Sequence, residues 1–215
     1  DMDMSSKAFI QNLENLIAEG QVSQSALDDA VRNVLRLKFK LGLFSKPYTN
    51  TSKPMETYSD KHLSTAKKTT EESIVLLKNE GNLLPFSDAV KSILVTGPLS
   101  EAPHDQLGTW TMDGEIERTQ TPAKALASMY GNRVKVHFVK GLEYSRDKEA
   151  SKIDDVVKAA NLVDAIVVCV GEEAILSGEA HCLADIGLQG VQSELIDKLK
   201  ATGKPLVMVV MAGRP

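Results

Sequence analysis

The sequence predicts an α/β fold, namely an α/β sandwich with a mostly parallel sheet. Four apolar runs rich in β-branched residues occur in the second part of the chain, and helical stretches lie between or beside them. Two of these runs, AIVVCV and PLVMVVM, are apolar at nearly every position, as is typical of central strands covered on both faces. In such sheets ligands bind beyond the carboxyl ends of the strands, so we expect a site in the loops that follow these runs.

Two helices are expected at the start of the chain. Apolar residues recur at helical spacing over 9–17, and Gly20 is placed to end this helix. A second helical pattern extends to about residue 41. Ser23 precedes it, and serine is a favoured N-cap because its hydroxyl can accept a hydrogen bond from a free backbone N–H. Residues 45–62 are rich in Pro, Ser, Thr and Lys without an apolar period, which indicates a linker.

The second part of the chain begins with a helical pattern over 63–79. Its apolar residues 74–77 fit either a strand or the buried end of that helix, and periodicity does not decide between them. The remaining elements are expected at 92–96, 134–139, 165–170 and 206–211 for the strands and at 122–130, 151–161 and 189–201 for the helices. Three loops then reach the carboxyl edge of the sheet: GPLSEAPHDQLGTW, GEEAILSGEAHCLAD and AGRP.

Composition and charge argue against several classes of function. Of the 215 residues 42% are hydrophobic and 25% charged, as in an ordinary soluble globular protein. The net charge of -4 disfavours a nucleic-acid or anionic-membrane partner, and no apolar stretch reaches the roughly 18 residues that span a bilayer. Cys169 and Cys182 fit neither a disulfide framework nor a metal-ligand spacing, so we expect two free thiols. The start DMDMSS and the end VVMAGRP lead us to expect a piece of a longer polypeptide.

The motifs of several common sites are missing from the sequence. It has neither a G-x-G-x-x-G nor a G-x-x-x-x-G-K-[ST] loop for phosphate, no paired His/Cys spacing for zinc and no G-x-S-x-G elbow. We therefore expect no metal and no cofactor. Carboxylates remain: Glu179, in a glycine-flanked loop beyond a strand, could act as one of the two carboxyl groups of a retaining glycosidase. From the residues alone, an acidic solvated loop remains the favoured interpretation.

Several segments occur in an informative order. The start DMDM and the stretch LDDAVRNVLRLKFKLGLFSKPY are followed by ESIVLLKNEGNLLPF, and then by TGPLS, LGTW, VVCVGE, SGEA and KPLVMVVMAGRP. In sequence and order these segments resemble family 3 glycoside hydrolases, most closely the bacterial periplasmic β-glucosidase type. The resemblance covers nearly the whole chain.

This resemblance implies a retaining exo-β-glucosidase, built as a (β/α)8 barrel followed by an α/β sandwich. Residues 1–44 would be the last helices of the barrel, 45–62 the linker, and 63–215 a sandwich that is incomplete at its C-terminal end. The nucleophilic aspartate of the family lies upstream on the barrel, so this chain would need the missing barrel as a partner and would be inactive alone. The resemblance also implies an oligosaccharide or glycoside substrate, no cofactor, and a periplasmic or secreted location.

Two site residues follow from the resemblance. Aligned on SGEAHCLAD, Glu179 takes the position of the acid/base catalyst and Asp185 that of the aspartate after it, but Leu183 stands where the family has an arginine. Trp110 in LGTW matches a tryptophan that could stack on a sugar ring, although a core aromatic is an open alternative. Glu172 matches a strand-end glutamate that supports the loop. Alternative functions are a β-xylosidase or arabinofuranosidase of the same family, or a non-catalytic carbohydrate-binding or interaction domain.

Overall fold

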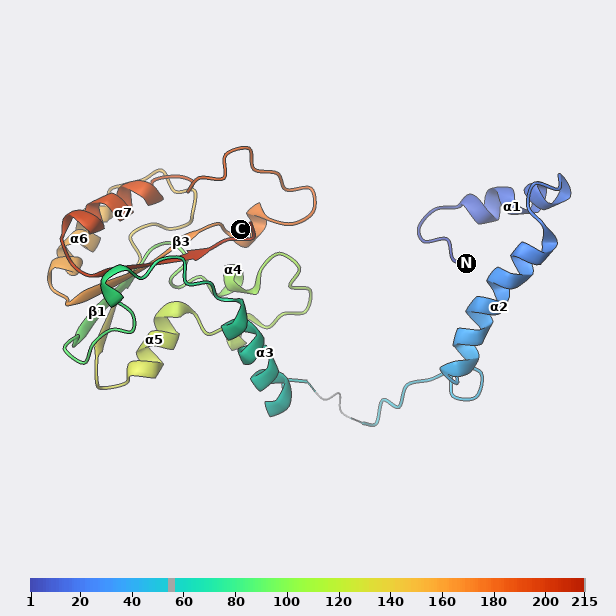
Figure 1. Ribbon diagram of the computed structural model, residues 1–215, viewed down its shortest axis with the longest axis horizontal. Coiled ribbons are helices and arrows are strands. Elements are labelled where there is room, and N and C mark those ends of the chain that lie inside the picture. The colour runs from blue at the N-terminus through green and yellow to red at the C-terminus, as the bar shows by residue number, and fades with distance from the viewer. Residues whose placement is uncertain (54–56, 215) are drawn as a thin grey trace. The chain divides into compact units, whose positions relative to one another are not determined.

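The computed structural model describes residues 1–53 and 57–214. Residues 54–56 of the predicted linker and Pro215 of the AGRP loop lie outside the described residues. The chain divides into two compact units, Asp1–Val75 and Leu76–Pro215, and each is described by itself (Figure 1). None of the helices in the described ranges is both long and apolar enough to cross a membrane.

The first unit begins with the two predicted helices, α1 (Ala8–Ala18) and α2 (Gln24–Lys40). The predicted cap is confirmed, because the Ser23 hydroxyl accepts a hydrogen bond from the Ala26 backbone N–H at 3.1 Å. Gly20 follows α1 with a φ of +75°, a left-handed conformation that glycine adopts without strain. No side chain of α1 or α2 is fully buried. In the apolar stripe of α2, Leu27, Ala30 and Val34 are half-buried, whereas Val31 and Leu35 are exposed.

The third helix, α3 (Asp60–Ser73), begins earlier and ends earlier than the sequence predicts. It begins at Asp60 because the Ser59 hydroxyl accepts from the backbone N–H of His62 at 3.5 Å. The expectation for residues 74–77 was wrong, because they form neither a strand nor a buried helix end and are exposed. The β-branched Ile74 turns the backbone to an extended conformation, and the described residues offer this run no strand to pair with.

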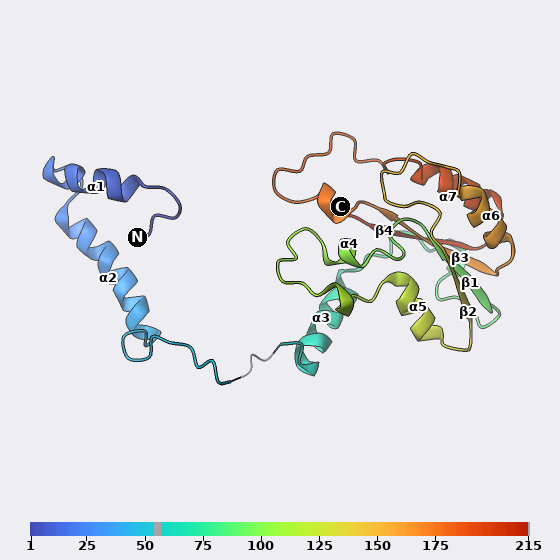
Figure 2. The ribbon, with the colours of Figure 1, turned by 180° about the vertical axis from the view of Figure 1, so that it is seen from behind.

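The second unit is built on a parallel sheet, which confirms the predicted fold class. Its strands are β1 (Ser92–Thr96), β2 (Lys135–Val139), β3 (Ala165–Gly171) and β4 (Leu206–Met211). They are ordered β2-β1-β3-β4, and every neighbouring pair is parallel (Figure 2). All the strands therefore end at one edge of the sheet, where the loops with the candidate residues begin.

Helices cover both faces of this sheet, as Figure 1 shows. On one face, α6 (Ile153–Asn161) and α7 (Gln192–Ala201) pack on the sheet in a core cluster. On the other face, α5 (Pro122–Tyr130) packs on a second cluster. The shorter helical elements are α4 (Pro103–Leu107) and the 3-10 turns Glu80–Asn82, Ile116–Arg118 and Ala174–Leu176.

The outermost strand differs from the prediction. Every residue of β3 is buried, as expected of a central strand. The prediction of a central position for PLVMVVM was wrong, because β4 pairs with β3 alone among the described strands. Its residues Val207, Val209 and Met211 pack on one core cluster, whereas Met208 and Val210 are each 50% exposed.

The ends of β3 and β4 approach each other very closely. Gly171 has a φ of +137°, and a Cβ atom placed on it would lie 1.9 Å from the Met211 carbonyl oxygen. No side chain fits at this position, because the contacting atom belongs to the backbone of a paired strand and cannot swing away. The glycine therefore allows the two strand ends to leave the sheet side by side.

Gly171→Ala should lower the free energy of unfolding by about 3 kcal/mol or more, since both the backbone conformation and the close approach would be strained. Gly203→Ala is the matched control. Gly203 also has a positive φ, of +70°, but its added Cβ would meet no atom within 4 Å, so a loss of only roughly 1–2 kcal/mol is expected. Urea unfolding followed by circular dichroism measures both, and equal losses would contradict the close-approach argument.

The two cysteines are free thiols, as predicted. Burial in β3 raises the pKa of the Cys169 thiol to about 12, whereas Cys182 is exposed. At about pH 8 an aromatic disulfide reagent should therefore titrate one thiol quickly and the second only after denaturation. Cys182→Ser should abolish the fast phase, and a fast phase that survived this substitution would show that Cys169 is accessible.

Candidate active site

Loops from all four strands meet at the carboxyl edge of the sheet. A cleft of about 330 Å³ opens there between the loop after β1, the loop after β3 and the residues after β4. The cleft is lined by Leu99, Asp105, Gln106, Gly108, Glu172, Glu173, Ala174, Ser177, Val210, Met211, Ala212 and Gly213. This is the edge at which the sequence predicts a site, and both predicted site residues lie on its loops.

A threonine joins the two loops that carry the predicted site residues. The Thr109 hydroxyl oxygen lies 2.8 Å from the Ala174 carbonyl oxygen, 2.9 Å from the Ser177 carbonyl oxygen and 2.8 Å from the Ser177 hydroxyl. Because a hydroxyl has one proton, it donates to one carbonyl at a time and can accept from Ser177. Thr109 immediately precedes Trp110, and Ser177 lies just before Glu179, so this contact brings the two loops together.

An arginine that the sequence analysis did not single out braces the same loop. Arg214 Nη1 donates to Glu172 Oε2 at 2.6 Å, and its Nη2 donates to the carbonyl oxygens of Leu176 at 2.5 Å and His181 at 3.1 Å. The sequence does contain a signal, since AGRP was expected at this edge of the sheet. It does not reveal that a charge after β4 pairs with a charge after β3, because that depends on strand order.

Glu179 lies in the exposed turn of this loop. Gly178 before it has a φ of +103° and Ala180 after it a φ of +61°, so two left-handed residues flank the glutamate. Within the described residues no hydrogen bond or ion pair engages its carboxylate. The backbone of the loop, rather than a side-chain partner, therefore sets the position of this carboxyl group.

Trp110 is 64% exposed and lies beside Thr109 on the loop after β1. Its indole is therefore not part of either core cluster of the second unit, and the core-aromatic alternative is wrong for this unit. An exposed indole near a cleft offers an apolar face on which a sugar ring can stack.

A second set of contacts fastens the base of the loop. Ser145 Oγ and Arg146 Nε donate to Glu173 Oε2 at 2.7 and 3.2 Å. Partial burial raises the pKa of Glu173, but these hydrogen bonds and the Arg146 charge outweigh it and hold the pKa below its ordinary value. The buried Gln192 bonds to both backbone groups of Gly171 and to the Ser145 carbonyl. Glu173 is thus an ionised structural anchor.

The loop after β2 is held to the loop after β3 by a buried aspartate. The Asp147 carboxylate accepts from the backbone N–H groups of Glu143 and Glu149, each at 2.9 Å, and these bonds lower its pKa. The Asp147 carbonyl accepts from Val191 N–H at 2.9 Å. A Cβ on Gly190 would lie 2.3 Å from that carbonyl oxygen, so only glycine fits the junction.

The other residues of the acidic loop take local partners. Asp185 Oδ1 accepts from the Gly187 N–H at 2.8 Å, and the His181 ring lies 3.1 Å from the Ser177 carbonyl. Leu183, which replaces the arginine of the family pattern, is half-buried. In the described part of the chain no group of three or more His, Cys, Asp and Glu side chains is placed to hold a metal ion.

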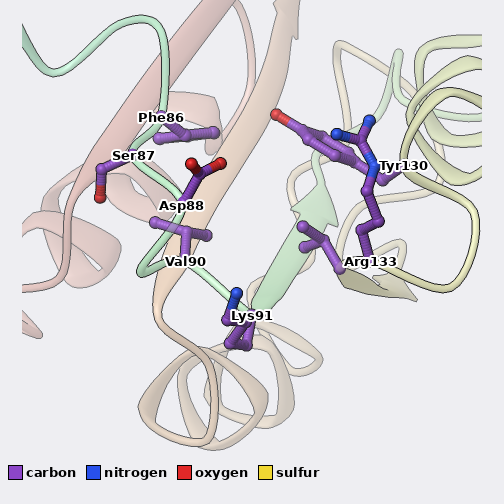
Figure 3. A pocket seen from close by; sticks show the side chains of 8 residues that line it. Phe86, Ser87, Asp88, Val90, Lys91, Tyr130 and Arg133 are labelled. Atoms are coloured by element: carbon purple, nitrogen blue, oxygen red, sulfur yellow. The ribbon is translucent and has the colours of Figure 1, made fainter.

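A smaller hollow of about 230 Å³ lies elsewhere, next to the amino ends of β1 and β2 (Figure 3). Phe86, Val90 and Tyr130 line it together with the charged Asp88, Lys91 and Arg133. It is remote from the loops that follow the strands, and neither predicted site residue lines it. Its arginine is a useful reference for Arg214, because within the described residues the Arg133 side chain donates to one carbonyl, that of Met129, at 3.4 Å.

Thr109→Val should loosen the loop after β3, because it keeps the side-chain shape but removes the hydroxyl that joins the two loops. Leaving the carbonyl groups of Ala174 and Ser177 less well paired should destabilise the loop by about 1–3 kcal/mol. We expect faster hydrogen exchange over 174–181, measured by mass spectrometry. Thr109→Ser retains the hydroxyl and is the control; identical exchange in the two variants would argue against the contact.

Related protein sequences match nearly all of the chain. It is 35% identical to a periplasmic beta-glucosidase of Salmonella typhimurium over 100% of its length, and 33% identical to a beta-xylosidase of Formosa agariphila over 94%. The chain spans only 31% and 29% of these two proteins. It is thus similar to about three tenths of each relative.

Solved structures show the same likeness. A crystal structure of a beta-glucosidase from Listeria innocua in complex with glucose matches 100% of the chain with a TM-score of 0.87 and 32% identity, and the match covers 29% of that protein. The family model described as the glycosyl hydrolase family 3 C-terminal domain matches residues 74–215. The matched residues include the whole parallel sheet and the loop that carries Glu179. The chain therefore belongs to glycoside hydrolase family 3.

Proposed function

We propose that this chain is part of a retaining exo-β-glucosidase and that it supplies the acid/base loop. The observation that carries the proposal is that the backbone around Glu179 is held in place while its carboxylate stays unpaired among the described residues. Its loop is braced by Thr109 on one side and by Arg214 on the other, while the described residues leave its own carboxylate without a side-chain partner. A carboxyl group held in this way can face a substrate and exchange a proton with it.

In the proposed reaction Glu179 acts twice. As a carboxylic acid it protonates the glycosidic oxygen while an aspartate of the barrel attacks the anomeric carbon, which forms a covalent glycosyl–enzyme and releases the aglycone. As a carboxylate it then removes a proton from the water that hydrolyses this intermediate. Retaining enzymes place the two carboxyl groups roughly 5 Å apart, so the aspartate would have to come from a domain that faces this loop.

The proposed barrel is supported by the first unit. We assign residues 1–44 to its last helices, 45–62 to a linker and 63–215 to the sandwich. The helices α1 and α2 bury no side chain, although α2 has an apolar stripe that would pack well on a barrel. The chain alone, at 31% of the length of the Salmonella relative, should not hydrolyse glycosides.

The sugar is proposed from the names of the relatives. Glucose is favoured by the beta-glucosidases of Salmonella typhimurium and Listeria innocua, and the second candidate is xylose, favoured by the beta-xylosidase of Formosa agariphila. Trp110 would stack on the sugar or aglycone at the entrance of the site. The periplasmic Salmonella relative supports a periplasmic or secreted location.

Glu179→Gln, in the full-length protein, should separate substrates by their leaving groups. With an alkyl β-glucoside, whose leaving oxygen needs a proton, kcat/KM should fall by about 10²–10⁴-fold. With a dinitrophenyl β-glucoside, which departs unprotonated, kcat/KM should change little and kcat should fall, because the second step still lacks its base. Added azide should restore turnover and give β-glucosyl azide. Initial rates and product analysis measure both effects.

Glu194→Gln is the matched control, because it makes the same chemical change on the solvent side of α7, where the glutamate forms an ion pair with Lys198 at 3.4 Å. It should leave both substrates unaffected. If Glu179→Gln cleaved the alkyl glucoside at the unaltered rate, Glu179 would not be the acid. A sandwich with a non-catalytic binding role would then be the better interpretation.

A further inference from the structure

We propose that Arg214 is a positioning residue, which holds the loop of Glu179 in the conformation from which the acid reaches the glycosidic oxygen. The proposal rests on the proposed function and adds a residue to it. Arg214 does not itself line the cleft, and its hydrogen bonds go to Glu172, which does, and to the loop backbone rather than to the Glu179 carboxylate.

The position of Arg214 follows from the pairing of β3 with β4. The register aligns Gly171 with Met211, and the Glu172 N–H continues the ladder by donating to the Met211 carbonyl at 2.9 Å. The residues after both strands therefore leave the sheet together. The resulting ion pair is well shielded from solvent, since the Glu172 side chain is 10% exposed and that of Arg214 25% exposed.

The second arm of the guanidinium closes the loop. Nη2 donates to the carbonyls of Leu176 and His181, which lie on either side of the segment SGEA that contains Glu179. The His181 N–H, just after this segment, donates to the Gly178 carbonyl within it at 3.3 Å, so the chain turns between the two carbonyls that Arg214 binds. Charge-assisted bonds from a planar guanidinium hold such a geometry better than neutral contacts.

Other contacts cannot replace this clamp. Thr109 bonds only the first arm of the loop, at Ala174 and Ser177. Among the side chains that the structure describes outside the loop, Arg214 is the one whose hydrogen bonds reach both arms. The backbone before it is also fitted to the loop, because a Cβ on Gly213 would lie 2.5 Å from the Ser177 Cβ.

The test uses the full-length protein and compares Arg214→Met with Arg214→Lys. Loss of the clamp should displace the acid, and it should therefore slow only the cleavage of substrates whose leaving group must be protonated. In Arg214→Met, kcat/KM for an alkyl β-glucoside should fall roughly tenfold to a hundredfold, while that for a dinitrophenyl β-glucoside should change less than about twofold. Hydrogen exchange over 176–181 should quicken. Arg214→Lys keeps the charge but has fewer hydrogen-bond donors. Its kcat/KM for the alkyl β-glucoside and its exchange rate over 176–181 should lie between those of the wild type and of Arg214→Met.

Two controls separate the clamp from general effects. Arg133→Met removes the same charged group from the opposite edge of the sheet and should leave the leaving-group dependence unaltered. The double variant Arg214→Met with Glu172→Gln removes the unpaired charge that the single variant leaves behind. If the carbonyl contacts matter, the double variant should keep the same leaving-group dependence as Arg214→Met; wild-type behaviour would instead assign the effect to the stranded carboxylate and overturn the proposal.

The outcomes also distinguish this inference from the proposed function. Equal losses on both substrates in Arg214→Met and in Arg214→Lys, or unaltered exchange over 176–181, would overturn the positioning role. If Glu179→Gln shows the leaving-group dependence and neither Arg214 variant does, the proposed function stands and the inference falls. If Glu179→Gln shows none while exchange over 176–181 quickens in Arg214→Met, the proposed function fails, and Arg214 retains a role in ordering the loop alone.

Discussion

The pairing of β3 with β4 is the constraint on which the carboxyl edge of this domain depends. β3 is buried at every position, and β4 follows it in parallel from Ile166 and Leu206 to Gly171 and Met211. A shift of one residue would turn every side chain of β4 to the opposite face and would separate the groups beyond the strands. The register therefore secures the core and, at the same time, sets Glu172 beside Arg214.

The loop after β3 is held by contacts from other parts of the domain. Its acidic and glycine-rich sequence has little apolar surface to bury, so it cannot fold on its own side chains. Instead, a hydroxyl from the loop after β1 and a guanidinium from the residues after β4 bond its backbone carbonyls. Glu173 and the buried Gln192 fasten its start to the loop after β2. Four strand ends thus contribute to the position of one exposed carboxyl group.

This arrangement suits a group that has to change its protonation state during a reaction. The Glu172 carboxylate is occupied by its ion pair with Arg214, so it serves to hold the residues after the two strands together. Glu179 is held through its backbone, and its side chain is left to face solvent or substrate. The two glutamates lie close in sequence, yet the contacts around them assign one to structure and leave the other available for chemistry.

The sequence by itself determined the elements whose signal is local. The apolar runs predicted β1 and β4 to the residue, the serine before α2 predicted its cap, and the loop order placed Glu179 and Trp110 at the carboxyl edge. Prediction failed where a partner decides the outcome. Residues 74–77 are apolar enough for a strand but have none beside them among the described residues, and β4 is apolar enough for the centre but is the outermost of the described strands. Only the tertiary structure decided that Thr109 and Arg214 meet the loop of Glu179. Apolar periodicity is a property of neighbouring residues, whereas these contacts join segments far apart in the chain and exist only once the strand order is set.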